Sequence, residues 1–85
     1  PVWPNPASAG QEVTVSWHLN EPVAMTLELL DVRGRIVDTW LPMQSFPRGH
    51  HQRSFVLDAL QSGTYFYRLT TADGLVRSHT VQVVD

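Results

Sequence analysis

The stretch "LELLDVRGRIV", residues 27–37, joins two β-prone runs through a turn signal, and it decides the fold class. Apolar and polar side chains alternate through residues 23–31, which is the pattern of a strand with one buried face. Asp31 can hydrogen-bond the backbone ahead of it, and Gly34 can adopt positive φ, so residues 31–35 predict a type I turn that closes in a G1 bulge. Residues 35–43 then form the return strand. The stretch therefore predicts a β-hairpin.

The same period-two alternation continues on both sides of this hairpin, and no segment has an apolar 3.6-residue repeat long enough for a helix. Further strands are predicted over residues 12–19, 51–58, 64–71 and 75–85. The connections between them are predicted at residues 44–50, 59–63 and 71–74. Strands at this spacing, all compatible with antiparallel pairing, predict one all-β domain over residues 1–85, folded as an antiparallel β-sandwich.

Composition narrows the class of partner. The chain has 85 residues and a net charge of -2, and its six cations are all arginines. A nucleic-acid-binding surface or a polybasic membrane patch needs clustered cations, so neither partner is expected. There is no apolar run near the ~20 residues that span a bilayer, so direct membrane insertion is not expected either. The chain has no cysteine, so packing alone must hold the domain together.

The chain opens with "PVWPNP", residues 1–6, which holds three of its six prolines. Each proline fixes φ, lacks an N–H and favours an extended conformation in the residue before it. We expect an extended N-terminal arm that pairs weakly at a sheet edge. In this arm Asn5 should bind nearby backbone through its side chain, and Trp3 should pack against the sandwich.

Catalytic and metal-binding residues are not apparent. The four histidines lack metal-ligand spacing, and His50 and His51 should point to opposite faces of a strand. No serine lies in a nucleophile-elbow context, and no pair of carboxylates is suggestively placed. The chain is therefore expected to be neither an enzyme nor a cofactor-binding protein. Tyr65 and Tyr67 are expected in the core, with a tyrosine hydroxyl bound to backbone as at sandwich corners.

The three tryptophans raise an alternative function. Trp3, Trp17 and Trp40 could form a flat platform for sugar rings, as in a carbohydrate-binding module of a secreted polysaccharide-degrading enzyme. Trp17 shares its strand face with apolar residues, which favours the core instead. The face on which Trp40 lies is not fixed by its irregular strand. A second alternative is an Ig-like spacer with no signalling role.

Four segments together resemble a known family. "WPNPAS", "VTVSW", "LELLDVRGRIV" and "SGTYFYRL" occur in the order found in the type A C-terminal sorting domain of the type IX secretion system. A related Ig-like domain in the flagellar hook cap shares part of the pattern. The chain departs from the family at His79, near a usual lysine position, at its non-basic end and at Arg53. The residues that match the family motifs are Pro4, Asn5, Pro6, Leu29, Asp31, Gly34, Arg35, Val37, Gly63 and Tyr65.

The resemblance implies an Ig-like antiparallel β-sandwich of about seven strands, counting the arm. It also implies a C-terminal signal that directs a larger cargo, N-terminal in the same chain, through the periplasm and across the outer membrane. The cargo would be secreted or would reach the cell surface, where the domain is commonly cleaved and the cargo is released or attached to lipopolysaccharide. The implied partners are translocon or outer-membrane receptor components of the type IX system, and no cofactor is implied.

The last predicted strand is a candidate contact for that machinery. Its end, "VQVVD", has no lysine or proline, and such a strand invites pairing with another chain if it lies at a sheet edge. Capture by strand addition would use its backbone for affinity and its alternate side chains for selectivity. A central or covered strand is the competing interpretation. The candidate contact residues are His79, Val81, Val83, Val84 and Asp85.

Overall fold

The computed structural model describes residues 2–58 and 60–84, which form strands, turns and loops. This part of the chain contains no helix that is long and apolar enough to cross a membrane. Six long strands and two short ones succeed one another along the chain. They are β1 (Val2–Trp3), β2 (Ala7–Ser8), β3 (Glu12–Leu19), β4 (Val23–Leu30), β5 (Ile36–Phe46), β6 (Gly49–Val56), β7 (Gly63–Thr71) and β8 (Val76–Val84).

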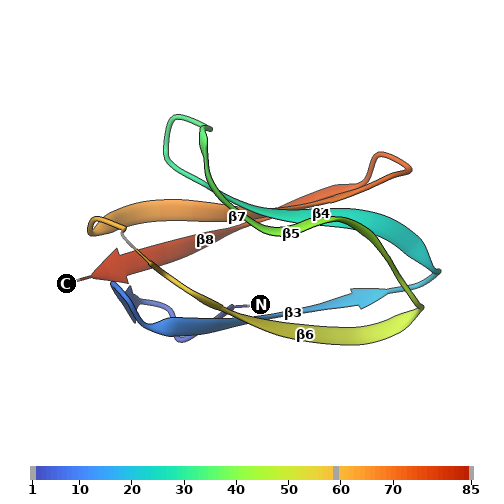
Figure 1. Ribbon diagram of the computed structural model, residues 1–85, viewed down its shortest axis with the longest axis horizontal. Coiled ribbons are helices and arrows are strands. Elements are labelled where there is room, and N and C mark those ends of the chain that lie inside the picture. Colours follow the sequence, from blue (N-terminus) through green and yellow to red (C-terminus); the bar gives the residue numbers. More distant parts are fainter. Residues whose placement is uncertain (1, 59, 85) are drawn as a thin grey trace.

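The strands form two sheets that pack face to face, as Figure 1 shows. One sheet has the order β1-β3-β6, and the other has the order β2-β8-β7-β4-β5. Every pair of neighbours is antiparallel except β2 with β8. The predicted antiparallel β-sandwich is confirmed. The N-terminal arm contributes two short strands, one to each sheet, which brings the number of described strands to eight.

The core lies between the sheets and follows the predicted alternation. In β3 the odd-numbered residues are buried, and β4 places Met25, Leu27 and Leu29 at the centre of the sandwich. Their registers with β7, such as Leu27 opposite Leu69, stack apolar side chains in rows across the sheet. Tyr65 and Tyr67 are buried as well, so the expected core of β7 is confirmed.

The hairpin of residues 27–37 forms as predicted. The Gly34 N–H donates to the Asp31 carbonyl at 3.0 Å, and the Asp31 N–H donates to the Arg35 carbonyl at 2.9 Å. Gly34 has φ +81°, a conformation that a side chain would strain. The glycine therefore allows the chain to turn within five residues.

The predicted loop at residues 44–50 is wrong. β5 continues through Phe46, β6 begins at Gly49, and only Pro47 and Arg48 make the corner. Phe46 is buried and meets Trp17 edge to face, with ring centroids 5.7 Å apart, so core packing extends the strand past the polar residues before it. Pro42 is accommodated because the β4–β5 register shifts beside it.

The tryptophans do not form a sugar-binding platform. Trp17 and Trp40 are buried, and Trp40 stacks on Phe55 with the ring centroids 4.6 Å apart. Trp3 is 45% exposed, so the expectation that it packs against the sandwich is wrong. Its partner in the ladder is Thr14, a half-buried residue whose side chain lies on the outer face of β3, which leaves the indole ring in contact with solvent.

Candidate functional site

Half of the motif residues meet at one end of the sandwich. Asp31, Arg35, Val37, Gly63 and Tyr65 line a shallow pocket of about 560 Å³ between the β4–β5 turn and the segment that precedes β7. In Figure 1 this is the end at which the β4–β5 turn, the start of β7 and the end of β8 lie together. The topology thus assembles residues that are 34 positions apart in the sequence, from Asp31 to Tyr65.

The Asp31 carboxylate stabilises the β4–β5 turn by accepting hydrogen bonds from residues within the turn. Its Oδ1 accepts hydrogen bonds from the backbone N–H groups of Arg33 at 2.9 Å and Arg35 at 3.0 Å. Its Oδ2 accepts from Arg35 Nε at 2.8 Å. The backbone hydrogen bond from Arg35 is the main cause that lowers the pKa of Asp31 below its ordinary value. Asp31 therefore stays ionised, and holds Arg35 in place, to a lower pH than an ordinary aspartate would.

Tyr65 closes the segment before β7. Its hydroxyl donates to the Gln61 carbonyl at 2.8 Å, which confirms the predicted tyrosine-to-backbone bond. Gly63, at φ +153°, begins β7 and pairs with Val83 of β8. These two motif residues therefore fix how the chain enters the strand beside β8.

Asn5 ties the N-terminal arm to β8. Its Nδ2 donates to the Thr80 carbonyl at 3.0 Å, and its Oδ1 accepts from the Gln82 N–H at 2.9 Å. The expected binding of the Asn5 side chain to backbone is therefore present, and its partners lie on a strand that is distant in the sequence. Directly after Pro6, β2 pairs with the end of β8.

The motif residues thus have conformational roles. Asp31 and Asn5 bind backbone, Gly34 and Gly63 allow backbone conformations, and Leu29 is buried in the core. Val37 is the clearest exception, since it is exposed on β5. A sequence pattern of this kind specifies the shape of one end of the domain more than it supplies side chains for a partner.

The candidate contacts on β8 divide into two groups. Val81 and Val83 are 0% and 2% exposed, so their side chains are not available to a partner in the folded domain. Val84 is 44% exposed, and His79 is exposed while its ring stacks on Tyr67 at 5.2 Å between centroids. Asp85 lies outside the described residues.

The edge of β8 is also partly occupied. β2 pairs with Val83 and Val84, and Asn5 binds the backbone at Thr80 and Gln82. The covered-strand interpretation therefore holds for the end of β8. Deleting residues 81–85 would remove two core side chains, so such a deletion tests folding as well as recognition.

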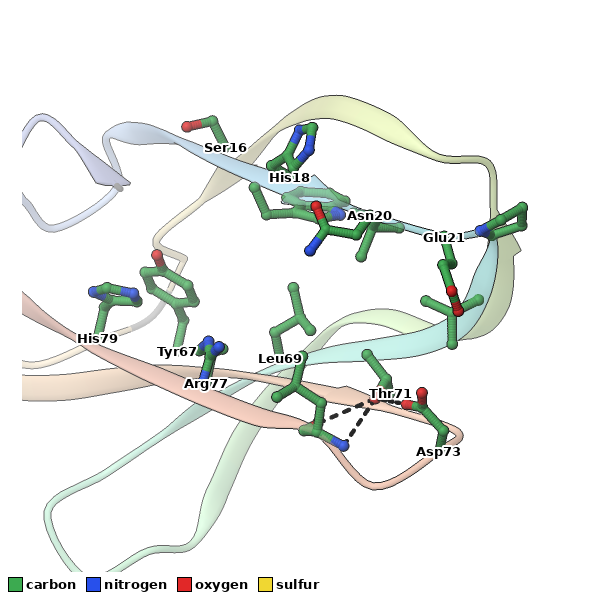
Figure 2. Close-up of a pocket in the computed structure, with 15 residues that line it drawn as sticks. Ser16, His18, Asn20, Glu21, Tyr67, Leu69, Thr71, Asp73, Arg77 and His79 are labelled. Carbon is green, nitrogen blue, oxygen red and sulfur yellow. Dashed lines mark hydrogen bonds between the residues drawn. The ribbon is translucent and has the colours of Figure 1, made fainter.

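A second hollow lies on the side of the sandwich where β3 faces β7 and β8, shown in Figure 2. This groove has a volume of about 540 Å³. Its apolar lining consists mainly of Trp17, Leu19, Tyr67 and Leu69, and its rim carries His18, Asn20, Glu21, Asp73, Arg77 and His79. Sequence reasoning missed the groove because it depends on how far the arm covers the two sheets.

The comparison with protein families decides the identity. Residues 1–83 match the family described as the secretion system C-terminal sorting domain. The chain belongs to this family. It is a sorting signal of type IX secretion, and its cargo is exported. No curated protein matches the chain.

Proposed function

We propose that this sorting domain directs a larger cargo protein, N-terminal in the same chain, to the type IX translocon. The cargo would pass through the periplasm to the cell surface, where it could be attached. The observation that carries the proposal is the family match over residues 1–83. The gathering of five motif residues at one end of the sandwich supports it, because that end is then a defined shape for a receptor.

Recognition would act on the folded domain and needs no chemical step. The motif residues set the course of the β4–β5 turn, the start of β7 and the arm. The exposed residues around them, including Val32, Val37 and Val84, are then held in fixed positions. Preorganisation of this kind lowers the conformational cost of binding.

An export assay tests the proposal. Residues 1–85 are fused to the C-terminus of a folded reporter that carries a periplasmic signal, in a host with a working type IX system. We expect the reporter at the surface or in the medium, and we expect this to stop when a translocon component is deleted. A reporter that stays in the periplasm beside a folded domain would contradict the proposal.

A variant that cannot fold tests whether export requires the folded domain or only its amino-acid sequence. Leu27 is fully buried in the central strand β4, so Leu27→Asp places a charge in the core and should unfold the domain. The fusion with Leu27→Asp should not be exported. Met43→Asp is the matched control, since Met43 is exposed on β5 outside the surface proposed for recognition and the same substitution there should leave the fold intact.

A further inference from the structure

Another strand could pair with the sandwich at its outer edges. At two of these edges, on β6 and on β5, local features hinder such pairing. On β6, Arg53 Nη1 donates to the Gln52 carbonyl at 2.9 Å and so occupies an edge acceptor. On β5, Pro42 lies where the register with β4 shifts. Charged side chains, prolines and bulges are common devices that prevent edge-to-edge pairing.

The third place, where β3 and β8 face each other, is guarded over only part of its length. β1 pairs with Thr14 and Val15 of β3, while β2 and Asn5 cover residues 80–84 of β8. Within residues 2–58 and 60–84, no strand pairs with the outer edge of β3 at residues 16–19 or of β8 at residues 76–79. We call these two stretches the open edges.

The backbone groups that face outward at the open edges follow from the hydrogen bonds on either side. Thr80, Gln82 and Val84 all bind the arm, so the even-numbered residues of β8 direct their backbone away from β7. Val76 and Ser78 continue this series. On β3 the Gln11 carbonyl accepts from Leu57 beside β6, so Ser16 and His18 face away from β6.

The groove lies directly between the open edges. Trp17 and Leu19 reach it from β3, and Arg77 and His79 reach it from β8. Trp17 is nine-tenths buried, and its indole Nε1 has no hydrogen-bond partner among the described residues. The groove thus offers apolar surface between two rows of unpaired backbone groups.

We propose that this groove binds an extended segment of a partner polypeptide, which adds as a strand to β8 at residues 76–79. The pairing would continue the ladder that β2 already forms along the same edge of β8. Alternate side chains of the segment would enter the groove, where apolar groups meet Trp17 and Leu69 and an acidic group meets Arg77. The proposal rests on the proposed function only in assigning the partner to the export machinery.

A second copy of this chain fits the groove poorly. In an antiparallel pair of β8 strands centred on Ser78, the residues that enter each groove would be Arg77 and His79 of the other copy. Arg77 of each copy would lie opposite His79 of the other, so neither copy brings an apolar or acidic side chain into the groove. The lining therefore favours a partner segment with apolar residues and an acidic residue opposite Arg77, while Glu21 and Asp73 at the rim disfavour acidic residues along its whole length.

A peptide titration tests the groove without the export machinery. The probe is a short acetylated peptide with threonine at every second position and valine or glutamate between. We expect amide shifts in NMR spectra at residues 76–80 and 16–19 and at the Trp17 indole. Shifts confined to β5 or β6, or no shifts with millimolar peptide, would overturn the proposal. Shifts at residues 76–80 that depend on protein concentration alone would also overturn it, since they would show a second copy in place of the segment.

A proline on each of two edges provides the matched pair of variants. Ser78→Pro removes an outward N–H of β8, and Ser78 has no ladder hydrogen bond to β7 to lose because its backbone faces the other way. Gln52→Pro makes the same change on the guarded edge of β6. Ser78→Pro should weaken peptide binding about tenfold, the upper end of what one lost hydrogen bond produces, while Gln52→Pro leaves it unchanged.

The same pair is then tested in the export assay, with thermal unfolding to show that both variants fold. Loss of export with Ser78→Pro and not with Gln52→Pro supports the proposal. Normal export of both variants would overturn it, even if the wild-type fusion is exported and the proposed function holds. If the wild-type fusion is not exported, the proposed function fails, and the peptide titration still decides whether the groove accepts a strand.

Discussion

The side-chain amide of Asn5 lies along the edge of β8 where a peptide group of a neighbouring strand would lie. One amide donates to the Thr80 carbonyl and accepts from the Gln82 N–H, two groups on the same strand. Proline cannot donate in such a ladder, so an asparagine between two prolines supplies by its side chain what the local backbone lacks. The Pro4-Asn5-Pro6 motif is therefore a device for closing a sheet edge.

Replacing Asn5 tests this role. Asn5→Ala removes both hydrogen bonds, and we expect it to lower the free energy of unfolding by about 1–2 kcal/mol in chemical denaturation. Hydrogen exchange at the Gln82 amide should accelerate. Asn20→Ala, at the exposed turn before β4, is the control and should change stability by no more than about 0.5 kcal/mol. Equal effects of the two substitutions would contradict the assignment.

Asp31 makes stability depend on pH. Its pKa in the folded state lies below the ordinary value of 3.8, mainly because the Arg35 N–H donates to the carboxylate. The stabilisation is therefore complete above the pKa of the unfolded chain and is lost as pH falls through the folded-state pKa. Asp31→Asn should be less stable than wild type near neutral pH, and thermal unfolding curves of the two proteins should converge in strong acid. A constant difference at all pH values would contradict this account.

At the scale of elements, the N-terminal arm joins the two sheets. β1 pairs with β3 in one sheet, and β2 pairs with β8 in the other. Ala7 is buried at the crossing, so the arm contributes to the core as well as to the edges. The arm thus covers half of one side of the sandwich and leaves the groove along the other half.

Removing the arm should uncover the edge of β8. We expect a chain that lacks residues 1–8 to show faster amide exchange at Gln82 and Val84 and to self-associate, because an uncovered apolar edge pairs with other chains. Size-exclusion chromatography with light scattering measures the association. Trp3→Ser, a change at an exposed arm residue, is the control and should remain monomeric. A truncated chain that stays monomeric with unchanged exchange would refute the covering role.

The sequence predicts elements where a local signal and the core agree. Alternation located β3 to the residue, and the Asp31–Gly34 spacing located the turn, because both signals act over a few neighbours. The β5–β6 corner was missed because burial of Phe46 overrides the loop-forming residues around it. The partner of Asn5, the exposure of Trp3 and the groove depend on contacts between distant segments, which alternation does not encode.

At the scale of the whole molecule, the two ends of the chain depend on each other. The arm has its place because β8 presents Thr80 and Gln82, and β8 has a closed edge because the arm lies on it. Val81 and Val83 also fill the core beside Tyr65, as their register with the start of β7 requires. β8 therefore contributes side chains to the core and also presents exposed side chains to solvent.

A chain that ends at Thr80 tests this dependence. It lacks Val81 and Val83, and full burial of each is worth about 1.5–3 kcal/mol, a large part of the ~5–15 kcal/mol that stabilises a small domain. We expect the truncated chain to lose near-UV circular dichroism and dispersed NMR signals. Val84→Thr, at an exposed position of the same strand, should keep both. A truncated chain with a native-like spectrum would contradict the prediction.

Because the arm pairs with β8, a receptor can recognise the folded domain only after β8 has been synthesised. A ribosome makes residues 76–84 after the other strands of the sandwich, and until they are present the arm has no strand to lie on and the sandwich lacks part of its core. A cargo whose synthesis stops before β8, or from which β8 is removed by proteolysis, would carry a sorting domain that does not fold. The domain would then fold only in chains whose synthesis has passed β8.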